Sequence, residues 1–552
     1  MDKRLSIALL LTAIVVAVTP VLFPTRRTPP VPSASPRPRT DSATTQVVEQ
    51  RADQIAPPKV GVVTDSASAA LPSQISQGRI VTVDTDRATY QFSTLGAAPL
   101  SVLMKEYRNL SPSDGKVELK VPGRRLLEYS LVVGRDTLPL RNTDFQVSQS
   151  TAATGETLLT FRGTVGGTNV VVGYSIAPKR YVTRVSGRVD NTPAQSFLLI
   201  DMPSSLPVTE ADTLGDLRNR SYSFKPMRSN AKGIPFSKLD PGERQLEAEP
   251  LTWAAVRNKY FVIGLIGLEG NAFDEMTITG GTRTSKVATT ASATLVKTIR
   301  NSTFGFDLYA GPQQSTELLA LGRDFDHVNP YGWSFLQPVV NPIAALCIKL
   351  LLWLHDHLKL SYGWVLVIFG IFIRIALWPL NQSAMRSSLK MQEIQPRLAE
   401  VQKKYKDKPE KQREEMMRVY REAGASPFTA LSGCLPMLIP MPVLFALFFV
   451  FQNTIEFRGV PFLWLTDISI KDPFYILPVL MGVSMYLLSW IGLKNAPPNP
   501  QAKMMSYMFP VMMTFVLANL ASGLNLYYTA QNLAALPQQW LLAKERQKAR
   551  KT

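Results

Sequence analysis

The apolar and polar positions divide this chain into two unlike parts. From residue 336 onward, apolar runs recur at about the length that a helix needs to cross a bilayer. We predict five spans there, at residues 361–380, 432–452, 474–491, 504–520 and 524–542. A further uncharged run, Leu5 to Phe23, follows a basic start. Because its core is long and no A-x-A site follows, we interpret residues 1–23 as an uncleaved membrane anchor.

The segment between this anchor and the later spans has a different period. Its short runs alternate apolar and polar residues, and Gly, Asn, Asp and Pro separate them, which is typical of strands and turns. Clear examples are residues 79–83, 89–92, 129–133, 158–161, 170–174, 182–189 and 304–309. The pattern therefore predicts an all-β sandwich over residues 76–330.

Two segments of other composition flank this domain. Residues 24–75 are rich in Pro, Ser, Thr and Ala, which predicts a disordered linker. Residues 331–360 contain an apolar stretch that Lys349, His355 and Asp356 interrupt. Its uncharged part is too short to span a bilayer, so we predict an amphipathic helix lying at the membrane interface.

Residues 383–425 separate two of the predicted spans and are strongly charged. Two apolar stripes at helical spacing flank the turn signal Lys406-Asp-Lys-Pro409 and predict an antiparallel helical hairpin. The stripes consist of Ile394, Leu398, Val401 and Tyr405, then Met416, Tyr420 and Ala423. Four basic residues are the candidate contacts of this hairpin with partners, namely Lys403, Lys404, Lys406 and Arg413.

The distribution of basic residues orients the chain in a membrane. The formal net charge is +18, and eleven Lys and Arg residues fall within 383–425, whereas 454–472 has only Arg458 and Lys471. Because cytoplasmic loops carry the excess of Lys and Arg, we predict six spans with both termini, the hairpin and the basic tail 544–552 in the cytoplasm. The β domain then lies across the membrane from the cytoplasm.

Prolines mark two helix boundaries among the spans. Asp472-Pro473 combines an N-cap residue with proline at the first helical position, which favours a helix start there. Pro436, Pro440 and Pro442 fall within the 432–452 span, where they either kink the helix and widen a groove or mark a late helix start.

Several classes of enzyme are disfavoured. No G-x-x-x-x-G-K-[ST], H-E-x-x-H or G-x-S-x-G motif is present, so we expect no ATPase, zinc-protease or serine-hydrolase chemistry. His355 and His357 are two apart and do not share a helix face, and we expect no metal and no cofactor. Cys347 and Cys434 fall at opposite membrane faces in this topology, so we expect no disulfide.

One charge stands within a predicted span. Arg374 lies about six residues before the end of the 361–380 span, which places it roughly 9 Å from the cytoplasmic boundary. A charged residue inside a span normally faces protein or a wet cavity, although an arginine near a helix end can also extend its charge to the interface. No acidic residue in any predicted span offers a partner, so Arg374 could attract an acidic residue of a passing substrate.

The last two spans contain further polar residues that could line such a groove. These are Asn519, Asn525, Tyr527, Tyr528, Gln531 and Asn532. Asn525, Tyr528 and Asn532 share one helix face. Two interpretations stay open, because amides also bridge helices within a bundle and tyrosines anchor membrane interfaces.

Specific segments from about 331 to 540 resemble the YidC insertases, which are related to the oxidase-assembly insertases of mitochondria and the thylakoid insertases of chloroplasts. The matching segments are Phe372-Ile-Arg-Ile-Ala-Leu-Trp-Pro-Leu380, Lys390-Met-Gln-Glu-Ile-Gln-Pro396, Gly433-Cys-Leu-Pro436, Asp472-Pro-Phe-Tyr-Ile-Leu-Pro478 and Ser522-Gly-Leu-Asn-Leu-Tyr-Tyr528. Pro440 departs from the family pattern, which usually has glutamine there, and 425–433 is longer than its counterpart.

The resemblance implies a multi-span α-helical membrane protein of the bacterial inner membrane. It would have six transmembrane helices, a five-helix insertase core over 361–543, and a periplasmic β-supersandwich. It implies insertion of nascent membrane proteins through a hydrophilic groove containing Arg374, without a bond being made or broken. The implied partners are nascent membrane proteins, the lipid bilayer, the Sec translocon, ribosomes and the signal-recognition pathway, and no DNA.

Two other functions compete with this interpretation. A polytopic transporter or channel would require repeat symmetry or a small-molecule flux that depends on Arg374, and no inverted repeat is apparent. An anchored sugar-binding protein of the envelope would require ligand binding by the domain at 76–330.

Overall fold

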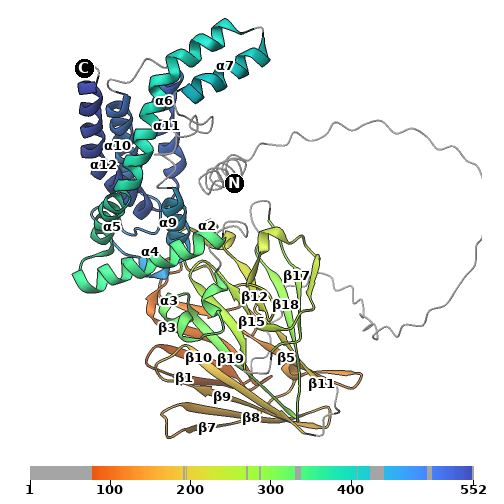
Figure 1. Cartoon of the computed structure of the whole chain (residues 1–552). Helices are drawn as coiled ribbons and strands as arrows, with labels where there is room; N and C mark the ends of the chain where they lie inside the picture. Colours follow the sequence, from red (N-terminus) through yellow and green to blue (C-terminus); the bar gives the residue numbers. More distant parts are fainter. Residues whose placement is uncertain are drawn as a thin grey trace, which may run out of the picture. The chain divides into compact units, whose positions relative to one another are not determined.

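The computed structural model describes most of the chain after residue 77 (Figure 1). The described residues are 78–190, 193, 196–268, 272–284, 288–329, 337–406, 408–422, 441–493 and 500–549. The expected anchor at 1–23 and linker at 24–75 lie outside them, as do Ala423, Cys434, Pro436 and Pro440. Residues Ile75–Thr552 form one compact unit.

Strands dominate the described residues up to Pro312, and every pair in their three sheets is antiparallel. The first sheet has the order β1-β2-β3-β4, with strands Ile80–Asp84, Ala88–Ser93, Ala98–Arg108 and Lys116–Lys120. The second has the order β14-β17-β18-β11-β5-β6, with strands Arg244–Glu247, Glu275–Gly280, Ala291–Thr298, Ser196–Asp201, Glu128–Val133 and Asp136–Pro139.

The third and largest sheet has nine strands in the order β13-β12-β15-β16-β19-β10-β9-β8-β7. Their bounds are Lys232–Pro235, Ser221–Pro226, Leu251–Arg257, Phe261–Gly267, Thr303–Pro312, Val182–Val189, Thr168–Ile176, Thr157–Val165 and Gln146–Thr151. The connections contain short helices, namely η1 Leu140–Asn142, α2 Thr213–Arg218, η2 Phe236–Lys238, α3 Ser315–Ala320 and η3 Phe325–Val328. Each of the seven stretches expected to be strands lies in a strand or overlaps one, which confirms a β-rich domain.

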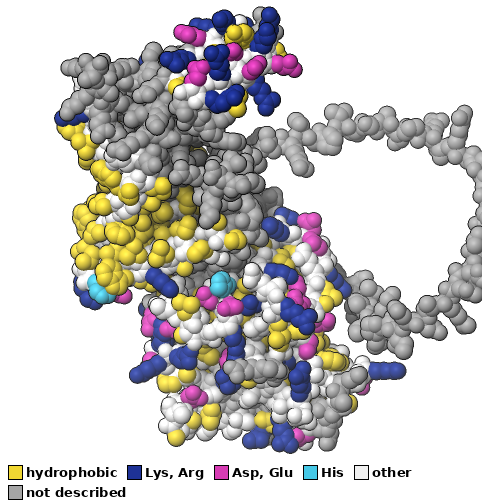
Figure 2. Space-filling model, in the orientation of Figure 1, with side chains coloured by type: hydrophobic (Ala, Val, Ile, Leu, Met, Phe, Trp, Pro, Cys, Tyr) yellow, Lys and Arg dark blue, Asp and Glu magenta, His cyan; other side chains and the backbone are white. Residues whose placement is uncertain are grey.

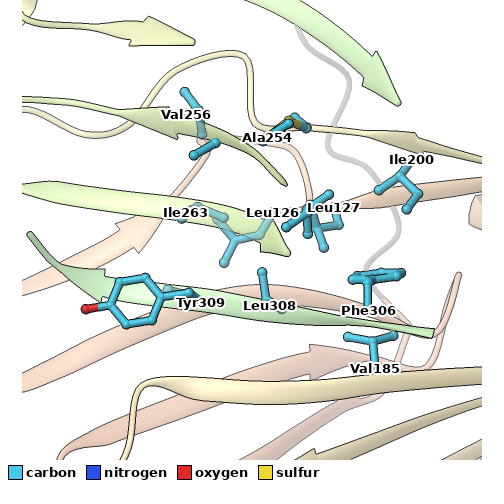
Figure 3. Close-up of a cluster of buried hydrophobic side chains, with 14 of the residues drawn as sticks. Leu126, Leu127, Val185, Ile200, Ala254, Val256, Ile263, Phe306, Leu308 and Tyr309 are labelled. Atoms are coloured by element: carbon cyan, nitrogen blue, oxygen red, sulfur yellow. The ribbon is translucent and has the colours of Figure 1, made fainter. Parts of the chain in front are cut away.

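One hydrophobic core is shared by all three sheets. Figure 3 shows part of it, with Ile200 of β11, Ile263 of β16 and Leu308 of β19 among the buried side chains. Strand β16 is buried along its whole length, as its unbroken apolar run requires of a strand covered on both faces. Burial of this kind, at about 25 cal/mol per Å² of apolar surface, is the main stabilising contribution to such a domain.

The rest of the described chain is helical. The helices are α4 Gln337–Leu358, α5 Tyr362–Ala376, α6 Trp378–Lys404, α7 Pro409–Glu422, α9 Met441–Asn453, α10 Ile476–Leu493, α11 Pro500–Leu517 and α12 Ser522–Ala549, with a short η5 at Ile455–Phe457. Helix α12 packs against α5 and α10, and α4 packs against α9. Helices α6 and α7 pack as the expected hairpin, in which Ile394 and Leu398 are buried against Met416 and Tyr420.

Several helix boundaries differ from the sequence-based prediction, and two of the differences have a clear local cause. Helix α5 ends at Ala376 rather than 380, because Pro379 lies in the first turn of α6 and cannot donate a backbone hydrogen bond across the junction at Leu377. Helix α10 begins at Ile476 rather than at Pro473. Asp472 accepts from the amides of Phe474 (3.0 Å) and Leu477 (2.7 Å), which closes a turn ahead of the helix. The positive φ of Tyr475 (57°) interrupts helical backbone at that point.

Two of the described helices are long and apolar enough to cross a membrane, Pro338–Leu358 and Ile476–Leu493, and three shorter apolar helices accompany them. On the face shown in Figure 2, hydrophobic side chains gather over the helical part, and charged ones over the sheets and the α6–α7 hairpin. Large apolar residues of α4 and α5 that are exposed include Leu346, Trp353, Trp364, Ile371 and Phe372. Because α4 itself has the length of a span, its interfacial position stays a prediction.

Candidate functional site

Arg374 lies in the last turn of α5 and is buried against α12. It is only 7% exposed, and its Nη2 donates to Oε1 of Gln538 over 2.8 Å. Gln538 is 1% exposed. A buried charge requires hydrogen-bond partners, and here the partner is a neutral amide. This contact orients the guanidinium but does not neutralise it.

A glycine allows α5 to approach α12 closely enough for this contact. Gly370 lies one helical turn before Arg374, and a Cβ at that position would lie 2.9 Å from the carbonyl oxygen of Tyr527. Small residues let helix backbones pack closely in membrane bundles, where packing drives association. The Phe369 and Tyr527 rings lie beside this approach, with centroids 5.7 Å apart.

Several buried donor groups without partners lie on α5 and on the face of α12 that contacts it. Tyr527, Gln531 and Gln538 recur on α12 at intervals of four and seven residues, which places them on one helix face. The Tyr527 hydroxyl, Gln531 Nε2, Gln538 Nε2 and Arg374 Nε are buried and have no hydrogen-bond partner among the described residues. Since all four can donate, this cluster suits a group that accepts hydrogen bonds.

The two candidate asparagines of α12 bond to neighbouring helices. Asn525 donates to the carbonyl of Leu517 (3.0 Å), where it satisfies the end of α11. Asn532 donates to the Ser484 hydroxyl of α10 (3.1 Å). These two asparagines thus make contacts of the kind by which amides bridge helices within a bundle.

The remaining candidate residues lie at different places. Tyr528 is buried at 8% exposure, whereas Asn519 is exposed in the turn after α11. The hairpin residues Lys403, Lys404, Lys406 and Arg413 are all exposed. Arg374 therefore contacts Gln538, and Gly370 of the same helix lies against the backbone of Tyr527 and Gln531. Asn519 and the hairpin residues are exposed and take no part in these contacts.

Gln538 is the residue of this cluster that the sequence-based prediction missed. A signal was present, because Gln531 and Gln538 are seven residues apart and so share the face that carries Tyr527. The prediction instead followed the face of Asn525, Tyr528 and Asn532.

A shallow apolar depression lies elsewhere, between α10 and α11. It has a volume of about 250 Å³ and is lined by Val479, Gly482, Val483, Tyr486, Pro510, Val511 and Thr514. Arg374 is not among its lining residues, so this depression is distinct from the polar cluster.

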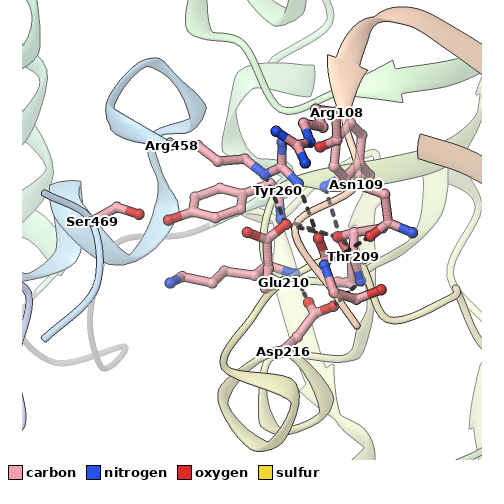
Figure 4. Close-up of polar contacts among 12 residues, drawn as sticks. Arg108, Asn109, Thr209, Glu210, Asp216, Tyr260, Arg458 and Ser469 are labelled. Atoms are coloured by element: carbon pink, nitrogen blue, oxygen red, sulfur yellow. Dashed lines mark hydrogen bonds and ion pairs between the residues drawn. The ribbon is translucent and has the colours of Figure 1, made fainter. Parts of the chain in front are cut away.

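A second polar centre joins the loop after α9 to the β domain (Figure 4). Arg458 donates to Glu210 Oε1 (2.8 Å) and to the carbonyls of Arg108 (2.8 Å) and Thr209 (3.0 Å). The Arg458 and Glu210 side chains are 5% and 4% exposed. The sequence-based prediction treated Arg458 only as a minor charge in a non-cytoplasmic loop, and nothing local in the sequence identifies its partner.

Two protein-family models match the chain, one in its helical part and one in its β domain. The family model described as "60Kd inner membrane protein" matches residues 353–550, and the model "YidC periplasmic domain" matches residues 80–345. The boundary between the two matches falls within α4.

Several bacterial relatives, each named "Membrane protein insertase YidC", are similar to the chain. The protein of Chlorobium luteolum is 29% identical over 550 residues, covering 90% of this chain and 88% of its own length. That of Pelodictyon phaeoclathratiforme is 34% identical over 334 residues, covering 56% and 55%.

A solved structure of the same name also matches. The crystal structure of YidC from Thermotoga maritima is 14% identical, covering 83% of this chain and 99% of that one, with a TM-score of 0.28. The two family models together extend from residue 80 to 550, and with relatives that match over nine tenths of its length the chain belongs to the YidC family.

Proposed function

We propose that this chain inserts nascent membrane proteins into the lipid bilayer, and that the buried cluster around Arg374 receives a polar segment of the substrate. Family membership and the shared name of the relatives support insertion. The observation that carries the site is the Arg374 guanidinium, which is buried in an apolar helix and whose one acceptor within the described part of the chain is a neutral oxygen.

The chemistry of this cluster favours a substrate segment rich in acceptors. A carboxylate or a backbone carbonyl would satisfy donors that the chain leaves without partners, and the positive charge would attract an acidic side chain. The apolar segment of the substrate would meanwhile transfer to lipid, driven by the hydrophobic effect and helped by the proton motive force. No covalent bond changes, so the process needs no cofactor.

The proposed arrangement is a multi-pass protein of the inner membrane with six spans, both termini cytoplasmic and the β domain periplasmic. The contact of Arg458 in loop 454–472 with Glu210 supports this topology, because it requires the loop and the β domain to lie on one side. The exposed Lys403, Lys404, Lys406 and Arg413 would face the cytoplasm, where ribosomes, the signal-recognition pathway and the Sec translocon are the proposed partners.

Insertion into liposomes tests the proposal. Purified protein is incorporated into vesicles, and insertion of a single-span substrate with an acidic translocated tail is measured for wild type, Arg374→Ala and Lys349→Ala. Lys349 is the matched control because it is an exposed basic residue of the apolar helix α4.

We expect Arg374→Ala to insert the substrate more slowly than wild type and Lys349→Ala to match wild type. Equal rates for all three proteins would remove Arg374 from the mechanism. No insertion by folded wild-type protein above empty vesicles would contradict autonomous insertion.

A further inference from the structure

The acceptor that orients Arg374 is an amide and not a carboxylate. Gln538 Oε1 lies 2.8 Å from Arg374 Nη2, and both side chains are at least 93% buried. Because both side chains are buried, bulk water does not compete with either of them for this hydrogen bond. The direction of the guanidinium therefore depends on Gln538.

The difference between an amide and a carboxylate matters for a buried cation. A glutamate at the same position would form a charge-assisted pair with the guanidinium and cancel much of its field. A glutamine supplies one acceptor of nearly the same shape and no charge. This pairing fixes the side chain of Arg374 and leaves its positive charge available to another group.

The groups that stay without partners point to the same conclusion. Nε of Arg374 and Nε2 of Gln538 are both buried and make no hydrogen bond to any residue that the structure describes. Each of them is a donor, and leaving a buried donor unsatisfied is unfavourable. The pair can thus donate to a further acceptor. A carboxylate would accept these hydrogen bonds and would also balance the positive charge of Arg374.

We propose that Gln538 is a positioning residue, which holds the Arg374 guanidinium in place without neutralising it and thereby sets a preference for acidic over neutral polar segments of the substrate. This inference rests on the proposed insertion function. The inference extends the site of Arg374 on α5 by Gln538 of α12, and it assigns to this site a preference for acidic segments.

The test uses the full chain in liposomes with two single-span substrates that are identical except for the translocated tail. One tail carries two aspartates and the other carries asparagines at the same positions. The readout is the ratio of the two insertion rates, which a general loss of stability would not change. The variants are Gln538→Glu and the control Gln539→Glu, which makes the same change one residue along, at a position near Gly492 of α10.

We expect wild type and Gln539→Glu to prefer the acidic tail by about tenfold, equivalent to about 1.4 kcal/mol. In Gln538→Glu the ratio should fall to about one, because the new carboxylate pairs with Arg374, while the asparagine tail still inserts. An unchanged ratio in Gln538→Glu would overturn the inference, as would equal insertion of both tails by wild type. Failure of wild type to insert either tail would instead refute the proposed function.

A second variant covers the case in which Gln538→Glu does not fold. Gln538→Met deletes the acceptor oxygen at similar volume and adds no charge. We expect its ratio to fall severalfold, because Arg374 loses its fixed direction. A ratio equal to that of wild type would show that Gln538 does not position Arg374.

Discussion

The buried ion pair between Arg458 and Glu210 allows a stability prediction with a defined magnitude. Both side chains are at most 5% exposed, so solvent screens their interaction little. Removing one partner of such a pair leaves an uncompensated buried charge and costs about 3–5 kcal/mol. In Arg458→Met, Glu210 would keep only the bond from the Thr209 hydroxyl (2.8 Å), so we expect the full effect.

Hydrogen exchange of the full-length protein is the suitable assay, because a chain with a β domain and a helical part is not expected to unfold in one step. The amides of residues 205–218 and 454–472 report the contact. A loss of about 3–5 kcal/mol predicts exchange that is roughly a hundredfold to several thousandfold faster there. Strands far from the contact, such as β8, should exchange as in wild type.

Two comparisons make the result decisive. Lys471→Met removes a basic charge from the same loop at an exposed position and should leave exchange unchanged. The double variant Arg458→Met with Glu210→Gln should be less destabilised than the sum of the single variants, because the two residues interact directly. An increase below about threefold in Arg458→Met, or strict additivity in the double variant, would refute the reasoning.

Three further predictions concern other parts of the chain. Burial lowers the pKa of Lys297 to about 8, so between pH 8 and about 10.5 the unfolded chain binds more protons and stability should rise with pH. Lys297→Met should therefore raise the temperature at which the β domain melts at pH 7, by an amount that reflects at most about 3 kcal/mol because the bond of Lys297 to the Ala272 carbonyl is lost. This gain should become small near pH 10.5, and a gain independent of pH would contradict this cause. Gly370→Val should force α5 from the Tyr527 carbonyl and cost about 1–3 kcal/mol, seen as a lower melting temperature in detergent; an unchanged value would show that the helices readjust freely. Leu398→Asp should separate α6 from Met416 of α7 and speed trypsin cleavage of the hairpin, and unaltered cleavage would mean that this small core does not hold it.

Elements with strong local periodicity were predictable from the sequence. The strand at 182–189 alternates buried and less buried residues over most of its length, and β10 has the same bounds. The hairpin was predictable for the same reason, since Ile394 and Leu398 are four residues apart and form its core. In both cases the pattern of burial is set by neighbours close in the sequence.

Features that depend on distant partners were not predictable. The order of the nine-stranded sheet places β19 between β16 and β10, and no local pattern determines that order. The same holds for Arg458, whose carboxylate partner lies 248 residues away. A helix start was predicted at Asp472, but the left-handed backbone of Tyr475 delays the helix to Ile476, and nothing in the sequence at Tyr475 indicates such a conformation.

The break at Leu377 has a mechanical consequence. Helix α6 is 27 residues long, which makes a rod of about 40 Å, and Arg374 lies three residues before the joint. A tilt of about 10° at Leu377 would carry the far end of this rod through about 7 Å and displace the backbone at Arg374 by less than about 1 Å. A tilt at this joint would therefore move the far end of the hairpin much further than Arg374, which lies against α12.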